Sequence, residues 1–345
     1  MKKSLKVISQ ILLVLLFYSC TVYQKIPIEV LRTEEMKLAV AKPKIAFIYR
    51  NFKFLMDTLQ LYYLQDEVLL PDKSNRVEEM DSLVVGDCLQ GAADEFKKNG
   101  VCENPVLYPL DIFPRQSGEK VYALPVELIK KLAMPAKADY LVSLETLSYF
   151  FSIYNGNGTT NPFQKVRMAA IWNLYNGVTG KLEDHKTMVD TMYWDSYSND
   201  GYFTKTALPP RIPAIQQAAQ IFGENYAKRF YSEWLTVDRM IFVPPLEDFR
   251  IAGEYAGKQE WDKAEAIWQK YADNHYGRLA ISACYNLALS HEISDDLTGS
   301  LKWVNEAFNL AKSYKKSEEL KLTLQYQSIL KKRLQEIERS KNQEE

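Results

Sequence analysis

The periodicity of the chain changes at Pro244-Pro245, and this change constrains the fold more than any other feature. Before the pair, short apolar runs typical of strands alternate with segments whose apolar residues recur every three or four positions. After the pair, only the helical periodicity remains. Because strands that alternate with helices build a helix-covered sheet, we expect an α/β domain with a mixed sheet at 26–243. An all-α module should follow at 246–339, with a disordered tail at 340–345.

The expected elements of the first domain follow from local pattern. Dense apolar runs predict its strands, and amphipathic spacing predicts its helices. Asn176-Gly177 predicts a tight hairpin between two of the strands. Pro213 is well placed to open a long helix that should run to about Leu235. The full set is strands at 26–31, 44–50, 105–110, 138–147, 165–175 and 187–194, and helices at 81–98, 126–132 and 213–235.

Residues 246–314 contain an internal repeat, displaced by 36 residues. Small residues recur where two helices would touch, and larger ones recur between the units. The segment resembles two tetratricopeptide-type helix pairs closed by a capping helix at 317–339. A pair of unrelated helical hairpins is the alternative. The matching positions are Ala252 with Ala288, Ala264 with Ser300, and Trp268 with Val304.

Stacked helix pairs of this kind would form a concave groove. Its candidate lining residues lack the basic and asparagine side chains with which some tetratricopeptide proteins clamp a peptide carboxylate. An apolar, aromatic groove instead suits a partner helix or another part of the same chain. The candidates are Phe249, Gly253, Ser282, Tyr285, Leu289 and Glu292.

The amino terminus carries three lysines, an apolar run at 11–17, and then Ser19-Cys20. The run is too short to span a bilayer and is typical of a signal peptide, here 1–19. The ending resembles the lipobox of bacterial lipoproteins, which implies a diacylglyceryl group on Cys20 and a lipidated tether at 20–25. Residues 21–25 lack an acidic cluster associated with surface export. We therefore expect a lipid anchor in the outer membrane, with the protein facing the periplasm of the cell envelope.

Charge and cysteine content exclude several classes of protein. The net charge of −1 provides no basic surface for nucleic acid. Apart from Cys20, the cysteines are Cys88, Cys102 and Cys284, an odd number that cannot form a closed disulfide framework. We expect three buried free thiols that behave as small apolar residues.

No catalytic or metal-binding motif emerges from the residue spacing. The histidines His185, His275 and His291 lie far apart, without metal-ligand spacing to a cysteine or carboxylate. Gly156-Asn-Gly158 lacks the lysine and helix start of a phosphate-binding loop. No serine or cysteine stands in a nucleophile motif. The sequence therefore favours a protein that is not an enzyme and that needs no cofactor or metal.

Aromatic residues cluster around the end of the predicted hairpin. Tyrosine and tryptophan anchor protein interfaces, and sugars stack on aromatic faces. The alternative is that alternate aromatic side chains simply pack the sheet. The candidate partner or glycan surface consists of Trp194, Tyr197, Tyr202 and Phe203.

Several segments resemble known envelope proteins. Ile45-Ala-Phe-Ile48, 138–142 and 172–181 are similar to the superfamily that includes the TolB amino-terminal domain and the CsgG-type lipoproteins. More narrowly, 190–194 and 234–239 resemble a family of uncharacterised Bacteroidota lipoproteins that end in tetratricopeptide-like helices. The resemblance implies an envelope domain with no agreed activity. We expect a membrane-anchored adaptor for an envelope protein, with glycan or peptidoglycan binding as the alternative.

Overall fold

The computed structural model describes residues 22–72, 77–156, 161–195, 208–274 and 277–342. These residues form two compact units, one of 36–231 and one of 22–35 with 232–342. The predicted fold class is confirmed, since an α/β region with a mixed sheet precedes five helices. The predicted boundary differs, because the first and last strands of the α/β region fold with the helices. Among the described helices, none has the length and apolar character needed to cross a membrane.

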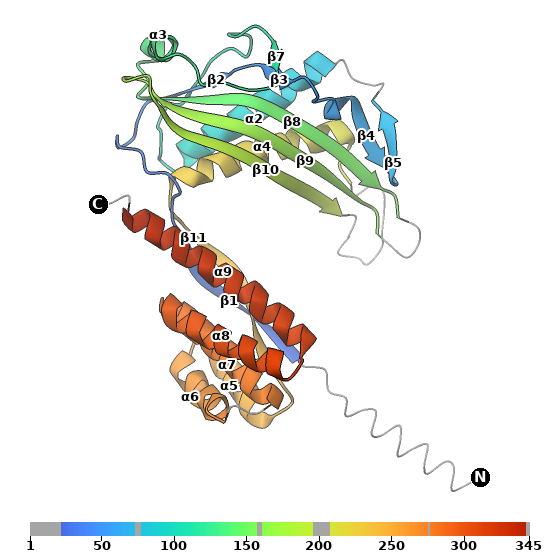
Figure 1. Ribbon diagram of the computed structural model, residues 1–345, viewed down its shortest axis with the longest axis vertical. Helices are drawn as coiled ribbons and strands as arrows, with labels where there is room; N and C mark the ends of the chain where they lie inside the picture. Colours follow the sequence, from blue (N-terminus) through green and yellow to red (C-terminus); the bar gives the residue numbers. More distant parts are fainter. Residues whose placement is uncertain (1–21, 73–76, 157–160, 196–207, 275–276, 343–345) are drawn as a thin grey trace, which may run out of the picture. The chain divides into compact units, whose positions relative to one another are not determined.

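The unit 36–231 is built on a seven-stranded mixed sheet (Figure 1). Its main path runs in the order β10-β9-β8-β2-β6, with β4 and β5 attached beyond β8. Pairing is parallel between β2 and both β6 and β8, and antiparallel along β8, β9 and β10. The bounds are β2 Ile45–Tyr49, β4 Tyr62–Gln65, β5 Val68–Pro71, β6 Val106–Leu107, β8 Tyr140–Tyr154, β9 Phe163–Asn176 and β10 Leu182–Asp195.

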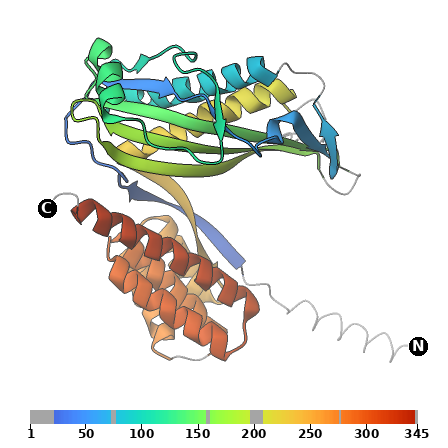
Figure 2. The ribbon, with the colours of Figure 1, turned by 45° about the horizontal axis from the view of Figure 1, so that its top comes forward.

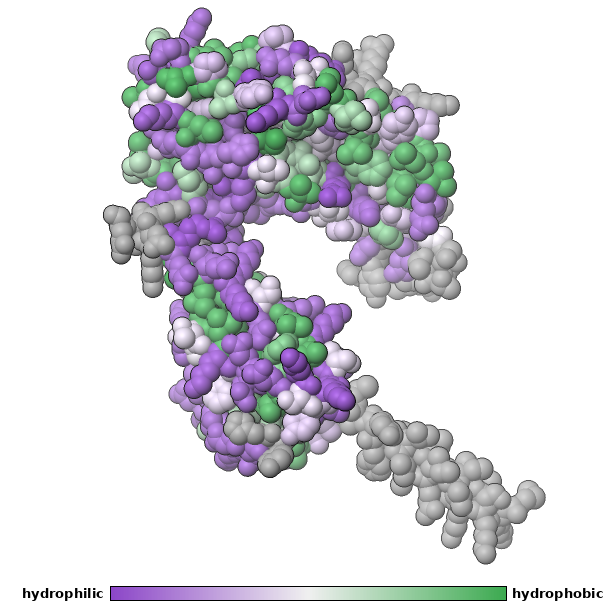
Figure 3. Space-filling model, in the orientation of Figure 1, coloured by the Kyte–Doolittle hydropathy of each residue, from purple (hydrophilic) through white to green (hydrophobic). Residues whose placement is uncertain are grey.

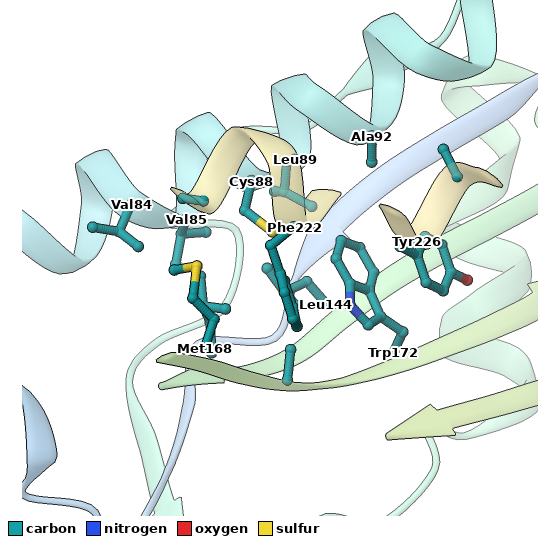
Figure 4. Close-up of a cluster of buried hydrophobic side chains, with 14 of the residues drawn as sticks. Val84, Val85, Cys88, Leu89, Ala92, Leu144, Met168, Trp172, Phe222 and Tyr226 are labelled. Carbon is teal, nitrogen blue, oxygen red and sulfur yellow. The ribbon is translucent and has the colours of Figure 1, made fainter. Parts of the chain in front are cut away.

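Two helices, α2 (Val77–Lys98) and α4 (Arg211–Ala227), lie side by side across one face of the sheet (Figure 2). Their side chains point toward those of β8 and β9 in a hydrophobic core (Figure 4). Trp172 of β9 stacks on Tyr226 of α4, with ring centroids 4.1 Å apart. The two helix backbones approach closely, because a Cβ on Gly223 would overlap the carbonyl oxygen of Cys88.

A β-bulge in β8 decides which side chains reach this core. The pairing with β9 shifts register between Leu144 and Thr146, so Glu145 is the extra residue. Even-numbered residues such as Val142 face α2 and α4 before the bulge, and odd-numbered ones such as Tyr149 face them after it. The bulge thus keeps the apolar side chains of one long strand on one face.

Residues 54–59 lie against part of the other face of the sheet, over β8 and β9, and a helix covers its β2 end. There α3 (Val126–Ala136) packs Ile129 and Ala133 against Ile48 and Leu141. The segments that follow β2 and β6 form a small parallel pair of strands, β3 (Phe52–Phe54) with β7 (Gln116–Gly118). Strand β2 is buried along its whole length, as expected for a parallel strand covered on both faces. Toward β10 this face carries partly exposed side chains.

The predicted hairpin is confirmed, and the predicted end of the last helix is wrong. Asn176 Oδ1 accepts hydrogen bonds from the Val178 and Thr179 amides at the turn between β9 and β10. The helix expected at 213–235 instead ends at Ala227, and a 3-10 turn (Lys228–Phe230) leads into strand β11 (Glu233–Val243). From 233 to 239 half-buried side chains alternate with exposed ones, and a partner strand stabilises the extended backbone.

In the second unit, β11 pairs antiparallel with β1 (Val22–Arg32) along its full length. Strand β1 therefore begins inside the segment 20–25 that we expected to be a tether. Five helices follow, and the repeat positions Ala252, Ala264, Trp268, Ala288, Ser300 and Val304 are all buried. Helix α9 extends past 339, so 340–342 is helical rather than a tail. The bounds are α5 Glu247–Gly257, α6 Trp261–Ala272, α7 Gly277–Ile293, α8 Leu297–Ser313 and α9 Ser317–Asn342.

Candidate functional site

Of the predicted aromatic surface, Trp194 falls within the described residues, while Tyr197, Tyr202 and Phe203 lie outside them, as does Cys20. Trp194 faces the helices: it packs against the core, and its Nε1 donates to Gln217 Oε1 of α4 at 3.2 Å. A broad exposed surface on Trp194 is therefore not observed. Its neighbour Tyr193 points to the other side of the sheet and is 67% exposed. The two-residue alternation of β10 could have identified Tyr193, because Met192 is a core residue.

The predicted helical groove is filled by the chain itself. Phe249, Ser282, Tyr285, Leu289 and Glu292 are all buried. The first and last strands of the α/β region account for this, because residues of β1 and β11 share one hydrophobic core with the helices. Phe242 of β11 packs edge-on against Tyr285, with ring centroids 4.8 Å apart. The groove therefore takes another part of the same chain, one of the two occupants that its apolar lining suggested.

Glu292 is the centre of a buried ion cluster rather than a ligand contact. Its carboxylate accepts two hydrogen bonds from Arg239 of β11, at 2.9 and 3.0 Å, and one from Arg333 of α9 at 2.6 Å. Tyr326 of α9 adds a fourth at 2.6 Å. Burial by itself raises the pKa of Glu292, but these hydrogen bonds and positive charges outweigh it and lower the pKa. The cluster fastens β11 and α9 to α7.

The side of β8, β9 and β10 that faces away from α2 and α4 forms a partly uncovered surface, which we call the open face. It contains two adjoining hollows. One, of about 380 Å³, is mainly apolar and is lined by Phe54, Met56, Asp57, Leu59, Thr146, Ser148, Ala169, Ala170, Ile171 and Thr187. The other, of about 550 Å³, contains aromatic and charged groups and is lined by Leu64, Phe150, Ser152, Lys165, Arg167, Val189, Asp190, Thr191 and Tyr193.

Lys165 and Arg167 form no ion pair among the residues that the structure describes, although Asp190 also lines the second hollow. No ion pair or hydrogen bond engages the Arg167 guanidinium within the described part of the chain. Lys165 Nζ lies 5.5 Å from the ring centroid of Tyr154, which itself stacks on Phe163 at 4.4 Å. The open face therefore joins an apolar end to a cationic, aromatic end.

Exposed apolar side chains border this face along residues 55–69. Met56 is 91% exposed and Val68 is 57% exposed, and Leu55, Leu59 and Leu69 are exposed as well. Hydrophobic residues gather over the β4–β5 end of the unit in Figure 3. Clustered apolar exposure of this kind marks interaction surfaces, whereas scattered single residues do not.

A third hollow, of about 510 Å³, surrounds Arg211 at the start of α4. The guanidinium stacks over Tyr63, 4.6 Å from the ring centroid, and lies 5.6 Å from the ring centroid of Phe151. It also pairs with Asp72, whose carboxylate is buried. Because Asp72 already supplies the negative charge, this arrangement holds α4 to the β4–β5 hairpin rather than offering an anion site.

Glu145, His185 and His291 have structural partners. The bulge residue Glu145 is enclosed by Arg50, Asn173 and Tyr175, and its burial raises its pKa. His185 Nδ1 lies 2.7 Å from Asn173 Oδ1, and His291 Nδ1 lies 2.7 Å from Asp296 Oδ2. Within the ranges that the structure describes, no group of three or more histidine, cysteine or acidic side chains could hold a metal ion.

The prediction of three buried free thiols is confirmed. Cys88, Cys102 and Cys284 are buried and unpaired. Burial raises the pKa of each thiol, to about 12 for Cys284. A protonated, enclosed thiol is neither a nucleophile nor a metal ligand.

Comparison with known proteins identifies the family of the chain. A family described as Domain of unknown function (DUF8603) matches residues 43–242, more than half of the chain. The chain belongs to this family. The DUF8603 match contains the whole sheet and most of β11, and a second family, Domain of unknown function (DUF6340), matches 250–332 within the helices. A comparison with curated proteins finds no match.

Solved structures similar to this DUF8603 protein include three bacterial proteins. The PelC dodecamer from Paraburkholderia phytofirmans is 10% identical, with a TM-score of 0.24, over 59% of this chain and 96% of that chain. Protein XCC0632 from Xanthomonas campestris, of family DUF330, is 8% identical, with a TM-score of 0.26, over 57% and 85%. A minor lipoprotein from Acinetobacter baumannii is 9% identical, with a TM-score of 0.23, over 55% and 94%.

Proposed function

We propose that this protein is a lipid-anchored adaptor of the bacterial cell envelope, without catalytic activity, that binds a protein partner on the open face. The observation that carries the proposal is the exposed apolar border of that face, with Met56 and Leu55 as its most exposed members. Contiguous apolar surface is costly in water and is retained mainly where it is covered by another molecule.

The charge of the open face defines the chemistry of the partner. Lys165 and Arg167 line the same hollow as Phe150 and Tyr193. A protein surface with acidic side chains beside apolar ones complements this arrangement, since unlike charges steer the encounter and apolar contacts supply the affinity. We therefore assign the face to an acidic, amphipathic protein surface.

The anchor rests on the lipobox-like Ser19-Cys20. Two acyl chains, at about 0.8 kcal/mol for each buried methylene, would hold the protein firmly on a bilayer. A Cys20→Ser variant should move from the membrane fraction to the soluble fraction and lose incorporation of labelled palmitate. Protease treatment of intact cells should leave the protein uncut if it faces the periplasm. Palmitate labelling of Cys20→Ser would contradict the anchor.

Site-specific photo-crosslinking in intact cells tests the adaptor role. A photoreactive amino acid in place of Val189 should yield one discrete adduct, because this side chain is exposed in the second hollow. Arg167→Glu should weaken that adduct by reversing the charge of the face. The matched control is the same photoreactive residue in place of Lys302, an exposed position on α8. Equal adducts from both positions, or none from Val189, would contradict the proposal.

Glycan binding is a second candidate function, supported by the exposed ring of Tyr193 beside Lys165. Aromatic faces stack on sugar rings. If this function holds, Tyr193→Ala should lose retention on peptidoglycan sacculi while keeping its thermal stability. Retention that is unchanged in Tyr193→Ala would leave the protein partner as the occupant of the face.

A further inference from the structure

A separate cavity of about 300 Å³ lies where β2 ends. Tyr49 is the last residue of β2, Asp81 belongs to the second turn of α2, and Asp111 and Arg115 come from the segment after β6. In open α/β sheets, ligands bind in the crevice outside the carboxyl ends of parallel strands. The volume is at the lower end of the range for small-molecule pockets.

Two buried polar atoms of this cavity have no partner. Tyr49 is 5% exposed and Asp81 is 9% exposed, and neither Tyr49 Oη nor Asp81 Oδ1 makes a hydrogen bond within the described residues. Buried polar groups in folded proteins are almost always paired. Because both residues line one cavity, a molecule placed there can supply the two missing partners.

Charges of both signs surround the cavity, and Asp57 is a further carboxylate that acts on Tyr49 and Asp81. Lys53 Nζ lies 3.2 Å from Asp81 Oδ2 and also donates to the carbonyl oxygen of Leu147. At the rim, Asp111 and Arg115 are exposed side chains of opposite sign. A cationic ligand would meet Lys53, and an anionic ligand would meet Asp81 and Asp111. This mixture of charges favours a neutral ligand.

Hydroxyl groups match the two unpaired atoms best. A carboxylate oxygen only accepts hydrogen bonds, whereas a phenol both donates and accepts. Burial raises the pKa of Tyr49, so its hydroxyl keeps its proton at neutral pH. A ligand hydroxyl can donate to Asp81 Oδ1, and a second one can exchange a hydrogen bond with Tyr49 Oη.

We propose that this cavity binds a small, neutral, polyhydroxyl ligand about the size of one sugar ring. The site is independent of the partner surface proposed above, because none of its lining residues belongs to the open face. The specificity should lie in charge: a neutral ring should bind better than the same ring carrying an amine or a carboxylate.

Ligand-observed NMR on the full chain tests the proposal. The probes are glucose, N-acetylglucosamine and myo-inositol, with glucosamine and glucuronate as the charged comparators. At least one neutral probe should bind, and the charged comparators should bind at least tenfold more weakly. Tyr49→Phe should weaken that binding about tenfold by removing one hydrogen bond to the ligand.

The matched control is Tyr226→Phe. Tyr226 also has a buried hydroxyl that finds no partner among the described residues, but it does not line the cavity. Both variants should fold, because each removes an unpaired hydroxyl and leaves the ring in place. Binding that survives Tyr49→Phe, equal binding of the charged sugars, or a cavity that takes up only water and none of the probes would each overturn the proposal.

Discussion

Asn286 of α7 forms hydrogen bonds with both the backbone amide and the backbone carbonyl group of Phe242 in β11. Its Oδ1 accepts from the Phe242 amide at 2.8 Å, and its Nδ2 donates to the Phe242 carbonyl oxygen at 2.8 Å. One side-chain amide thus takes the place of a neighbouring strand at the edge of the β1–β11 ribbon. All four groups are buried, so the helix specifies which residue of β11 it contacts.

Asn286→Ala should lower the free energy of unfolding by about 2–4 kcal/mol, because two buried backbone groups lose their partners. Chemical denaturation followed by circular dichroism measures the loss. Asn309→Ala, an exposed position on α8, is the control and should change stability by less than about 0.5 kcal/mol. Equal effects of the two variants would show that the Asn286 contacts contribute nothing.

Glu292→Gln should destabilise the protein by about 3–5 kcal/mol at pH 7, since Arg239 and Arg333 would lose a buried countercharge. The folded-state pKa of Glu292 is lowered below its ordinary value of 4.5. Its contribution is therefore present above pH 4.5 and is lost as the pH falls through the folded-state pKa. The difference between variant and parent should shrink in acid, which unfolding curves from pH 7 to pH 3 would reveal. A difference independent of pH would contradict this account.

Gly223→Ala should destabilise the α2–α4 pair by about 1–3 kcal/mol or more, because its Cβ would overlap the Cys88 carbonyl oxygen. Gly86→Ala is the matched control in α2. Its Cβ would lie 3.8 Å from Leu110, an ordinary contact, so the higher helix propensity of alanine should raise stability by about 0.5–1 kcal/mol. Thermal unfolding should shift in opposite directions for the two variants. Shifts in the same direction would disprove the close approach.

The thiols of Cys88, Cys102 and Cys284 should resist alkylation at pH 8 in the folded protein. Burial encloses them and raises their pKa, so the reactive thiolate is scarce. Mass spectrometry after iodoacetamide treatment should find all three modified only when denaturant is present. Rapid labelling of any of them without denaturant would contradict the packing described for that residue.

Much of the fold was readable from local pattern. Asn176-Gly177 identified the hairpin, and the spacing of apolar residues located α2, α3, β2, β8 and the helices after Pro245. These elements depend on interactions within a few residues, which the sequence displays directly. The extent of the helix from Pro213 was misjudged, because residues 233–235 are strand only through pairing with β1, some two hundred residues earlier.

The candidate site was less predictable. The alternation of β10 places the neighbours Tyr193 and Trp194 on opposite faces of the sheet, but only the packing of α4 shows which of the two faces is covered. Likewise Phe249, Tyr285 and Glu292 had the character of a groove, but β11 covers them. The cavity beside Tyr49 joins residues from three separate segments and has no motif of its own.

By itself, the sequence determined the succession of strands and helices, the repeat of the helical region and the lipobox-like segment, since each of these depends on residues that are close together in the chain. The tertiary structure decided which surfaces are covered. It assigned β1 and β11 to the helical unit, filled the groove and left the open face exposed. The physical reason is that burial depends on contacts between distant segments. Because β11 packs on the helices, residues that could have lined a binding groove lie in a core.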